Sequence, residues 1–284
     1  ELFFKVIKKK IKSPIILIAS KKLINKQAKI LKKKINFSVT SEFEIIKKKN
    51  NLKKINLIDV DFNQSLGFEK ITSNSNNYIN SCFDIAIRLL KNKISNKFVN
   101  GPISKKNFLK KKFSGITEYL AHKTNTKKFA MIIYNKNLSV CPLTTHLPIK
   151  YVNKKINKLE IINKVKLINN FWKKEFGKKV KIGVTGLNPH CESIDSFSED
   201  KKIILPSIKK LKKLKYNIEG PLAADTIFLK NNRKKFDLVI GMYHDQVLAP
   251  IKTLFEYDAI NITIGLPFIR VSPDHGPNES MLGK

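Results

Sequence analysis

Hydrophobic and polar positions repeat with strand spacing in some stretches of the chain and with helical spacing in others. Residues 15–19 form a short apolar run that predicts a buried strand, and residues 78–91 carry the spacing of an amphipathic helix. Residues 157–176 show the same helical spacing and stop at Gly177, a residue type that commonly ends helices. Further elements are predicted as strands at residues 130–134, 138–145, 181–185 and 236–242 and as a helix at residues 200–214.

This alternation of strands and helices indicates the fold class. Strands separated by helices of this length are typical of a largely parallel sheet whose strands are joined by crossover helices. One pair differs, because Asn135-Lys-Asn137 is too short to hold a helix and predicts a hairpin between its flanking strands. We therefore predict an α/β fold.

Composition narrows the class of protein. A chain of 284 residues with 42% hydrophobic side chains is long and apolar enough to bury a sizeable core. Its three cysteines have no CxxC spacing, which excludes a disulfide scaffold or a zinc ribbon and fits a reducing compartment. No apolar run approaches the roughly 18–20 residues of a membrane helix. We expect a cytoplasmic protein with no membrane partner.

The net charge raises a second possibility. Lys and Arg number 56 against 22 Asp and Glu, which gives a formal net charge of +34 and invites a polyanion-binding function. Only three of these bases are arginines (Arg88, Arg233 and Arg270), although arginine is the usual reader of guanine edges and the bidentate phosphate clamp. We interpret the excess as solvated surface lysine and expect no specific nucleic-acid partner. A basic polyanion-binding protein is the alternative from a different class.

Four histidines share one setting, directly after a predicted strand and beside a turn residue: His146, His190, His244 and His275. In parallel α/β folds, ligands bind outside the carboxyl ends of the strands. Three imidazoles from separate strand ends can form a metal site that keeps one position open for water or substrate. Structural histidines occur in the same setting, so the spacing alone leaves both interpretations open.

A cationic and polar group lies further along the chain. Lys252, Asn261 and Arg270 suit a phosphate or carboxylate ligand, while a surface ion pair is the simpler interpretation of Arg270. The sequence contains no GxGxxG, GxxxxGK[ST] or GxSxG motif, so it predicts no Rossmann fingerprint, phosphate loop or nucleophile elbow. Cys191 is not expected to act as a nucleophile with His190, because adjacent residues in an extended segment point to opposite sides.

Six motifs, in the same order, resemble the 4-hydroxythreonine-4-phosphate dehydrogenase family. The resemblance covers the chain from about residue 100 to residue 276 and is weak before that. The motifs are Thr144-Thr-His146-Leu-Pro148, Gly186-Leu-Asn-Pro-His190, Gly220-Pro-Leu-Ala-Ala-Asp225-Thr226, Met242-Tyr-His-Asp-Gln246, Asn261-Ile-Thr-Ile-Gly-Leu-Pro-Phe-Ile-Arg270 and Asp274-His-Gly276.

The resemblance implies two α/β/α domains like those of isocitrate and isopropylmalate dehydrogenases, with the active site in the interdomain cleft of a homodimer subunit. On this basis the first domain comprises residues 1–109 plus 261–284, and the second comprises residues 110–260. That group of enzymes binds NAD without a Rossmann fingerprint, which agrees with its absence here. The resemblance therefore implies NAD and a divalent metal (Zn, Mg or Co) as cofactors.

The resemblance also assigns roles to single residues. The metal-binding histidines fall on His146, His190 and His244, the last supplied by the partner subunit. The substrate contacts fall on Thr117, Lys252, Asn261 and Arg270. His275 then has a supporting role. The general base stays open, with Asp245 and Asp274 as candidates by position.

The implied reaction is the NAD-dependent oxidation of 4-phosphooxy-L-threonine. Its β-keto acid product loses carbon dioxide to give 3-amino-2-oxopropyl phosphate, a step of pyridoxal phosphate (vitamin B6) biosynthesis. Ile116 stands where the family commonly has a histidine that contacts substrate, so a relative acting on a four-carbon sugar-acid 4-phosphate stays open. The family's opening Gly-Asp-Pro-Ala-Gly-Ile-Gly-Pro motif and final helix are also absent. We therefore expect a partial gene product, with an inactive ligand-binding remnant as a third alternative.

Overall fold

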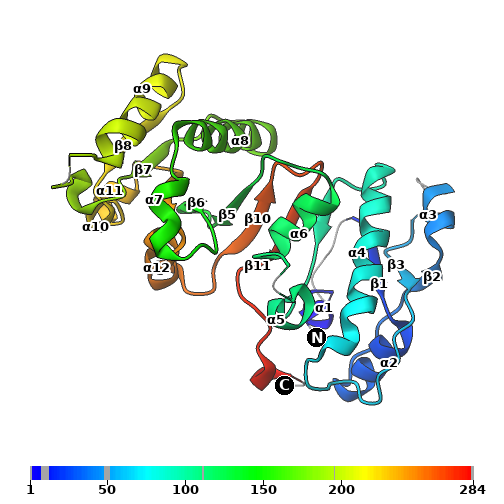
Figure 1. Ribbon diagram of the computed structural model, residues 1–284. Coiled ribbons are helices and arrows are strands. Elements are labelled where there is room, and N and C mark those ends of the chain that lie inside the picture. The colour runs from blue at the N-terminus through cyan, green and yellow to red at the C-terminus, as the bar shows by residue number, and fades with distance from the viewer. Residues whose placement is uncertain (1, 8–12, 48–51, 111, 195, 283–284) are drawn as a thin grey trace. The chain divides into compact units, whose positions relative to one another are not determined.

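The computed structural model of the chain describes residues 2–7, 13–47, 52–110, 112–194 and 196–282 (Figure 1). Contacts divide the chain into two compact units. Unit 1 comprises Glu1–Ile116 and His275–Lys284, and unit 2 comprises Thr117–Asp274. Among the described residues, no helix is both long and apolar enough to cross a membrane.

Unit 1 contains a parallel sheet in the order β1-β3-β2. The central strand, β3, packs against helices on both faces. Leu57 packs against Ile24 of α2 on one face, and Ile58 packs against Ile45 of α3 and Leu89 of α4 on the other. A strand covered on both faces is typically apolar throughout, as Ile55, Leu57 and Ile58 are. Asn56 is the exception: it is buried, and its side-chain amide donates to the Ile15 and Lys53 carbonyls. The elements of unit 1 are α1 (Leu2–Val6), β1 (Ile15–Ala19), α2 (Lys21–Ile30), β2 (Ser38–Thr40), α3 (Glu42–Lys47), β3 (Ile55–Asp59), α4 (Asn76–Lys91), β4 (Lys97–Val99) and α5 (Lys105–Leu109).

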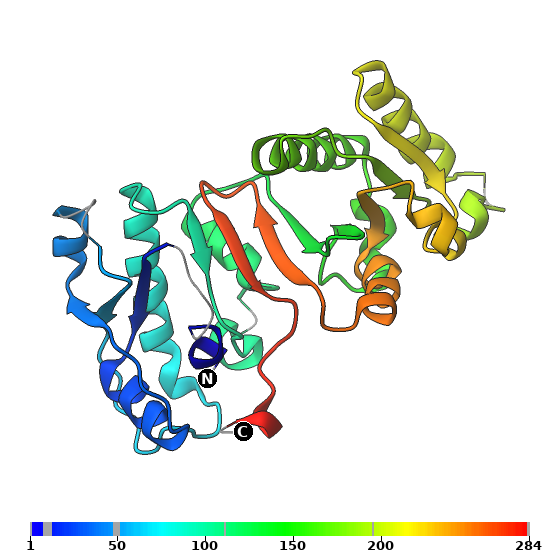
Figure 2. The same ribbon diagram turned by 180° about the vertical axis from the view of Figure 1, so that it is seen from behind.

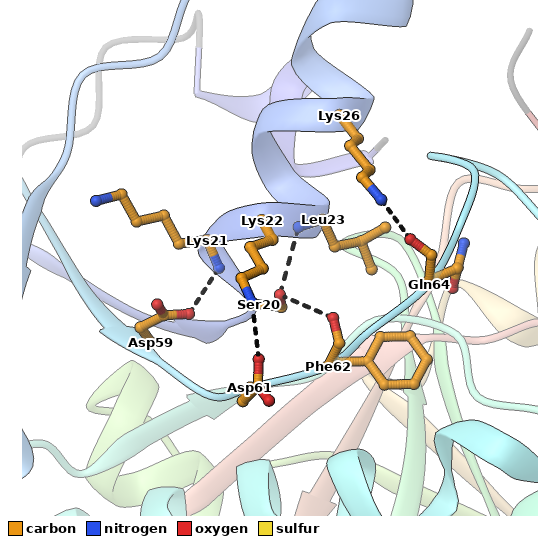
Figure 3. Close-up of polar contacts among 9 residues, drawn as sticks. All are labelled: Ser20, Lys21, Lys22, Leu23, Lys26, Asp59, Asp61, Phe62 and Gln64. Atoms are coloured by element: carbon orange, nitrogen blue, oxygen red, sulfur yellow. Dashed lines mark hydrogen bonds and ion pairs between the residues drawn. The ribbon is translucent and has the colours of Figure 1, made fainter.

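The junction between β1 and α2 is a side-chain cap. Ser20 is almost fully buried, and its hydroxyl accepts a hydrogen bond from the Leu23 amide at 3.3 Å (Figure 3). Asp59, at the end of β3, accepts from the Lys21 amide at 2.8 Å. These two acceptors satisfy amides that the first turn of a helix leaves without an intrahelical partner, and so they fix the start of α2.

The strands of unit 2 follow the order β11-β10-β5-β6-β9-β7-β8. Strands β6, β9, β7 and β8 run parallel, whereas β5 pairs antiparallel with both β6 and β10, and β10 pairs antiparallel with β11. Because β10 is antiparallel to β5, it runs in the same direction as β6, β9, β7 and β8, so only β5 and β11 depart from the expected parallel arrangement. Two short loops, residues 135–138 and 265–268, cause the difference, because such loops can join only antiparallel strands.

Helices cover both faces of the unit 2 sheet, which makes three layers (Figures 1 and 2). Ala130 and Ile132 of β5 face the cluster that contains α8, while Met131 and Ile133 face the cluster that contains α12. This alternation follows from the two-residue period of a strand. The elements are α6 (Ile116–Lys123), β5 (Ala130–Tyr134), β6 (Ser139–Thr144), α7 (Val152–Lys155), α8 (Lys158–Phe176), β7 (Ile182–Thr185), α9 (Leu205–Lys213), β8 (Ile218–Leu222), α10 (Ala224–Ile227), α11 (Lys230–Arg233), β9 (Leu238–Tyr243), α12 (His244–Phe255), β10 (Ile260–Ile264) and β11 (Ile269–Pro273).

Most predicted elements of unit 2 are confirmed. The hairpin around Asn135-Lys-Asn137 joins β5 to β6, and α8 ends at Gly177, whose φ of 67° is the left-handed conformation expected there. The predicted helix 200–214 begins as a π-helical turn, Asp200–Ile204, which continues into α9. β10 and β11 lie in unit 2, where β10 pairs with β5 and β11 pairs with β10. The domain boundaries stay a prediction.

Candidate active site

Two of the predicted metal ligands lie side by side. Strands β6 and β9 are parallel neighbours, with Thr144 in register with Tyr243, so His146 and His244 leave the sheet at the same edge. Their ring centroids are 5.4 Å apart, with an angle of 38° between the planes. The carboxyl ends of adjacent parallel strands thus bring these two imidazoles together.

His146 sits in a turn that side-chain hydrogen bonds hold in place. Its φ of 41° is left-handed, a conformation that few residues other than glycine adopt. The Thr144 hydroxyl donates to the Met242 carbonyl at 2.8 Å, and the Thr145 hydroxyl donates to Glu118 Oε1 at 3.2 Å. These bonds tie the turn to strand β9 on one side and to helix α6 on the other. The exposed imidazole therefore stands on a fixed backbone.

His244 is the first residue of α12, directly after β9. Its Nδ1 lies 2.7 Å from Asp245 Oδ1, and the Asp245 side chain is 83% exposed. A carboxylate at Nδ1 orients the ring and leaves Nε2 available to a ligand. Asp245, one of the two candidate bases, thus contacts a predicted metal ligand.

His190 follows β7, the strand on the other side of β9. It lies in a short 3₁₀ turn, Pro189–Cys191, with a left-handed φ of 54°, and its side chain is exposed.

Cys191 shares the left-handed conformation, and burial together with nearby Asp200 raises the pKa of its thiol. This shift disfavours the thiolate that nucleophilic chemistry would need.

The three histidines do not form a metal cage within one chain. Among the residues that the structure describes, no group of three or more His, Cys, Asp or Glu side chains is arranged to hold a metal ion. The resemblance assigned His244 to the partner subunit's site, and such a site would be assembled only in a dimer. The ligand set therefore stays a prediction.

The predicted anion contacts are largely buried. Arg270 of β11 is 3% exposed, and its Nη1 donates to Thr263 Oγ1 at 3.3 Å. Thr263 Oγ1 lies 3.3 Å from Thr117 Oγ1, so two predicted substrate contacts share one hydroxyl neighbour. Burial lowers the pKa of the Arg270 guanidinium to about 10, and the Glu118 carboxylate partly opposes that shift. The group therefore stays cationic at neutral pH, where little water competes for an anion.

Lys252 and Asn261 stand in different settings. The Lys252 ammonium on α12 forms an ion pair with Asp274, whose side chain is only 2% exposed, so this candidate base is already engaged. The Asn261 side-chain oxygen on β10 is buried without a hydrogen-bond partner among the described residues. A buried polar oxygen with no partner is costly, and a bound ligand is one way to satisfy it.

Three polar residues of the site region were missed by the sequence reasoning. Gln246 accepts from Thr185 and from the Met242 amide and donates to the Gly186 carbonyl, which joins the ends of β7 and β9. Glu118 supports the His146 turn, and Asp200 holds the His190 loop. Gln246 lies within a quoted motif and Glu118 lies two residues after Ile116, but Asp200 carried no signal because it lies ten residues beyond His190 in a polar stretch.

Two further residues were singled out in the sequence but are not among the predicted metal ligands or substrate contacts. His275 falls in unit 1, is exposed, and its Nδ1 lies 2.9 Å from the Gly276 carbonyl oxygen. Ile116, which replaces a histidine of the family pattern, is only 6% exposed. Its apolar side chain is thus accommodated as a core residue.

Known proteins resemble the chain over almost its whole length. A family profile described as pyridoxal phosphate biosynthetic protein PdxA matches residues 10–284. The 4-hydroxythreonine-4-phosphate dehydrogenase of Sulfurihydrogenibium sp. is 37% identical over 274 residues, covering 95% of this chain and 83% of that protein. The D-threonate 4-phosphate dehydrogenase of Pectobacterium atrosepticum is 36% identical over 165 residues, covering 58% of this chain and 51% of that protein.

A solved structure agrees with these sequence matches. The crystal structure of 4-hydroxythreonine-4-phosphate dehydrogenase from Klebsiella pneumoniae superposes with a TM-score of 0.79 at 25% identity, covering 95% of this chain and 84% of that one. The α/β fold and the matches define the class of the protein as a dehydrogenase, an oxidoreductase. More particularly, the chain belongs to the PdxA family of pyridoxal phosphate biosynthetic proteins.

Proposed function

We propose that the chain oxidises 4-phosphooxy-L-threonine with NAD⁺ to a β-keto acid, which decarboxylates to 3-amino-2-oxopropyl phosphate. The observation that carries the proposal is the identity of 37% over 274 residues to a dehydrogenase named for this substrate. Pyridoxal phosphate biosynthesis is the corresponding pathway. Because the family membership assigns a redox activity, the charge of +34 requires no separate polyanion-binding function.

His146, His190 and His244 would hold the divalent metal. Their chemistry fits, because neutral imidazoles bind Zn²⁺ and related ions and three of them leave a coordination position open. The orienting contact between Asp245 and His244 is also typical of histidine ligands. When bound, the metal would act as a Lewis acid toward the substrate hydroxyl and the later carbonyl, and NAD⁺ would accept the hydride.

The residues of the chain bind and orient the phosphorylated substrate. Arg270 would hold the phosphate or carboxylate through its buried guanidinium, which offers charge-assisted hydrogen bonds in a site with little water. Lys252 would add a second positive charge next to the substrate, and its ammonium is also paired with the Asp274 carboxylate. Thr117 and Asn261 would contribute a hydroxyl and an amide. For the general base, Asp245 is exposed and beside an imidazole, whereas Asp274 is buried in its ion pair.

The substrate assignment has one specific competitor. D-threonate 4-phosphate, a four-carbon sugar-acid phosphate, is the substrate named for the Pectobacterium atrosepticum relative at 36% identity. Ile116 supports this second candidate substrate, because an isoleucine cannot supply the hydrogen bond that the histidine common at this position in the family makes to the substrate. Incubation of the purified protein with NAD⁺ and either substrate, followed by NADH absorbance, decides between them. NADH formation with neither substrate would overturn the proposal, and a chelator should stop the reaction that does occur.

His190→Ala tests the metal assignment. We expect the variant to lose metal binding and activity while its circular dichroism stays that of the wild type, because the His190 side chain is exposed and its loss leaves no buried gap. Full activity in this variant would refute the assignment.

Mixing two inactive variants tests the proposed homodimer with its shared site. If His244 completes the partner's site, His190→Ala and His244→Ala subunits together form heterodimers in which one site has all three imidazoles. We expect recovery of up to about a quarter of wild-type activity after random exchange of subunits. If each chain forms its own site, no mixture recovers activity.

A further inference from the structure

The loop that carries His190 depends on a buried carboxylate that belongs to another element. Asp200 opens the π-helical turn before α9 and is 1% exposed. Its Oδ1 accepts from the Leu187 amide at 2.8 Å, and its Oδ2 accepts from the Asn188 amide at 3.2 Å and the Asn188 side-chain amide at 2.9 Å. Three donors of one loop therefore converge on one side chain.

The backbone around these contacts leaves little room for adjustment. A Cβ atom on Gly186 would lie 2.5 Å from Asp200 Oδ1 and 2.7 Å from Cys191 Sγ, so only glycine fits at the start of the loop. At the other end, His190 and Cys191 adopt left-handed φ values of 54° and 61°. Non-glycine residues persist in that conformation only where their surroundings impose it. The contacts of Asp200 fix residues 187 and 188, and Asn188 is held further by its side-chain donation to Glu199 Oε2 at 3.3 Å and by the Cys191 amide, which donates to its carbonyl at 3.0 Å.

We propose that Asp200 is a positioning residue, which holds residues 186–191 in the conformation that presents His190 to a metal ion. Both carboxylate oxygens are occupied by amide donors, so Asp200 acts through the loop and not as a ligand. Partners that orient a ligand from outside the coordination sphere commonly change metal affinity by 10–100-fold when they are mutated. This inference rests on the proposed metal site of the preceding section.

Asp200→Asn is the test variant, because it keeps the shape of the side chain but replaces one acceptor oxygen with an amide group that faces a donor. Asp237→Asn is the matched control. Asp237 Oδ2 accepts from the Lys181 amide at 2.8 Å and Oδ1 accepts from Lys178, at the opposite end of β7 from His190. Both variants thus lose a carboxylate that binds a backbone N–H beside the same strand.

The measurement is Zn²⁺ affinity of the purified protein, by competition with a chromophoric chelator, with the absorption bands of bound Co²⁺ as a report on coordination. We expect Asp200→Asn to weaken Zn²⁺ binding at least about tenfold and to alter the Co²⁺ bands. Asp237→Asn should leave both unchanged. Wild-type Zn²⁺ affinity and wild-type Co²⁺ bands in Asp200→Asn would overturn the inference.

A second variant covers the case in which Asp200→Asn does not fold. Asn188→Ala removes the 2.9 Å contact to Asp200 and a 3.3 Å contact to Glu199 Oε2, and it leaves the Asp200 carboxylate and its two backbone bonds in place. It should weaken Zn²⁺ binding in the same direction by a smaller factor, and unchanged affinity would count against the inference. If the wild-type protein binds no Zn²⁺ or Co²⁺, the proposed metal site itself fails. If the wild type binds and both variants bind equally well, only the role of Asp200 fails.

Discussion

Replacement of Gln246 by leucine is a direct test of how the sheet edge is held together. The side chain is buried and makes three short hydrogen bonds: it accepts from Thr185 Oγ1 at 2.8 Å and from the Met242 amide at 2.7 Å, and it donates to the Gly186 carbonyl at 2.8 Å. Leucine has a similar volume but no polar atom. The variant therefore removes the three bonds with little change in packing.

The expected loss of stability follows from these bonds. A hydrogen bond between buried groups contributes about 1 kcal/mol net, and the orphaned partners cost more when water cannot reach them. Three such bonds imply a decrease of about 3 kcal/mol in the free energy of unfolding of unit 2. Gln246→Glu should be at least as harmful, since it buries a charge and places an oxygen against the Gly186 carbonyl.

Urea unfolding followed by tryptophan fluorescence measures this loss. Trp172 is the single tryptophan of the chain, is 3% exposed and lies in the core of unit 2, so its emission reports on the unit that contains Gln246. Gln64→Leu is the control, because within the part of the chain that the structure describes the Gln64 side chain donates only to the nearby Leu66 carbonyl, at an exposed position of unit 1. A decrease below about 1 kcal/mol for Gln246→Leu would refute the reasoning, because it would mean that the three bonds together contribute less than one such bond is expected to contribute.

Three further predictions concern packing and thiol chemistry. Gly186→Ala should destabilise the protein by about 1–3 kcal/mol in the same urea assay, because its Cβ would overlap Asp200, and an unchanged midpoint would show that the loop can shift. Leu57→Ala, at a fully buried position of unit 1, should cost about 2–5 kcal/mol by circular dichroism; a loss under 1 kcal/mol would contradict the packing described. Burial raises the pKa of Cys82 and of Cys141 to about 11, which lowers the thiolate fraction at pH 8. Alkylation of both thiols in the native protein should therefore be far slower than in urea and should accelerate as pH rises toward 11, whereas equal rates in native and unfolded protein would contradict the burial.

The apolar pattern of the sequence was sufficient to predict individual elements where local rules act alone. The strand at residues 15–19, the β5–β6 hairpin and the end of α8 at Gly177 depend on side-chain period, loop length and the left-handed freedom of glycine. The motifs were also sufficient to predict the family, which the matches confirmed. The reversed direction of β11 was not predicted, although the short loop 265–268 between β10 and β11 requires it.

The sequence by itself determined the fold class, the family and the residue types of the candidate site. Only the tertiary structure decided which of these residues meet: His146 and His244 lie 5.4 Å apart because β6 and β9 are neighbours, although 98 residues separate the bonded pair Thr144 and Met242. It also decided the buried supports, since the contacts of Gln246 and Asp200 join segments that no local pattern relates. Local sequence determines the spacing of apolar side chains and the residue types at turns, whereas the order of the strands and the burial of each side chain arise from packing of the whole chain. Those global features determine which polar groups must find partners within the protein.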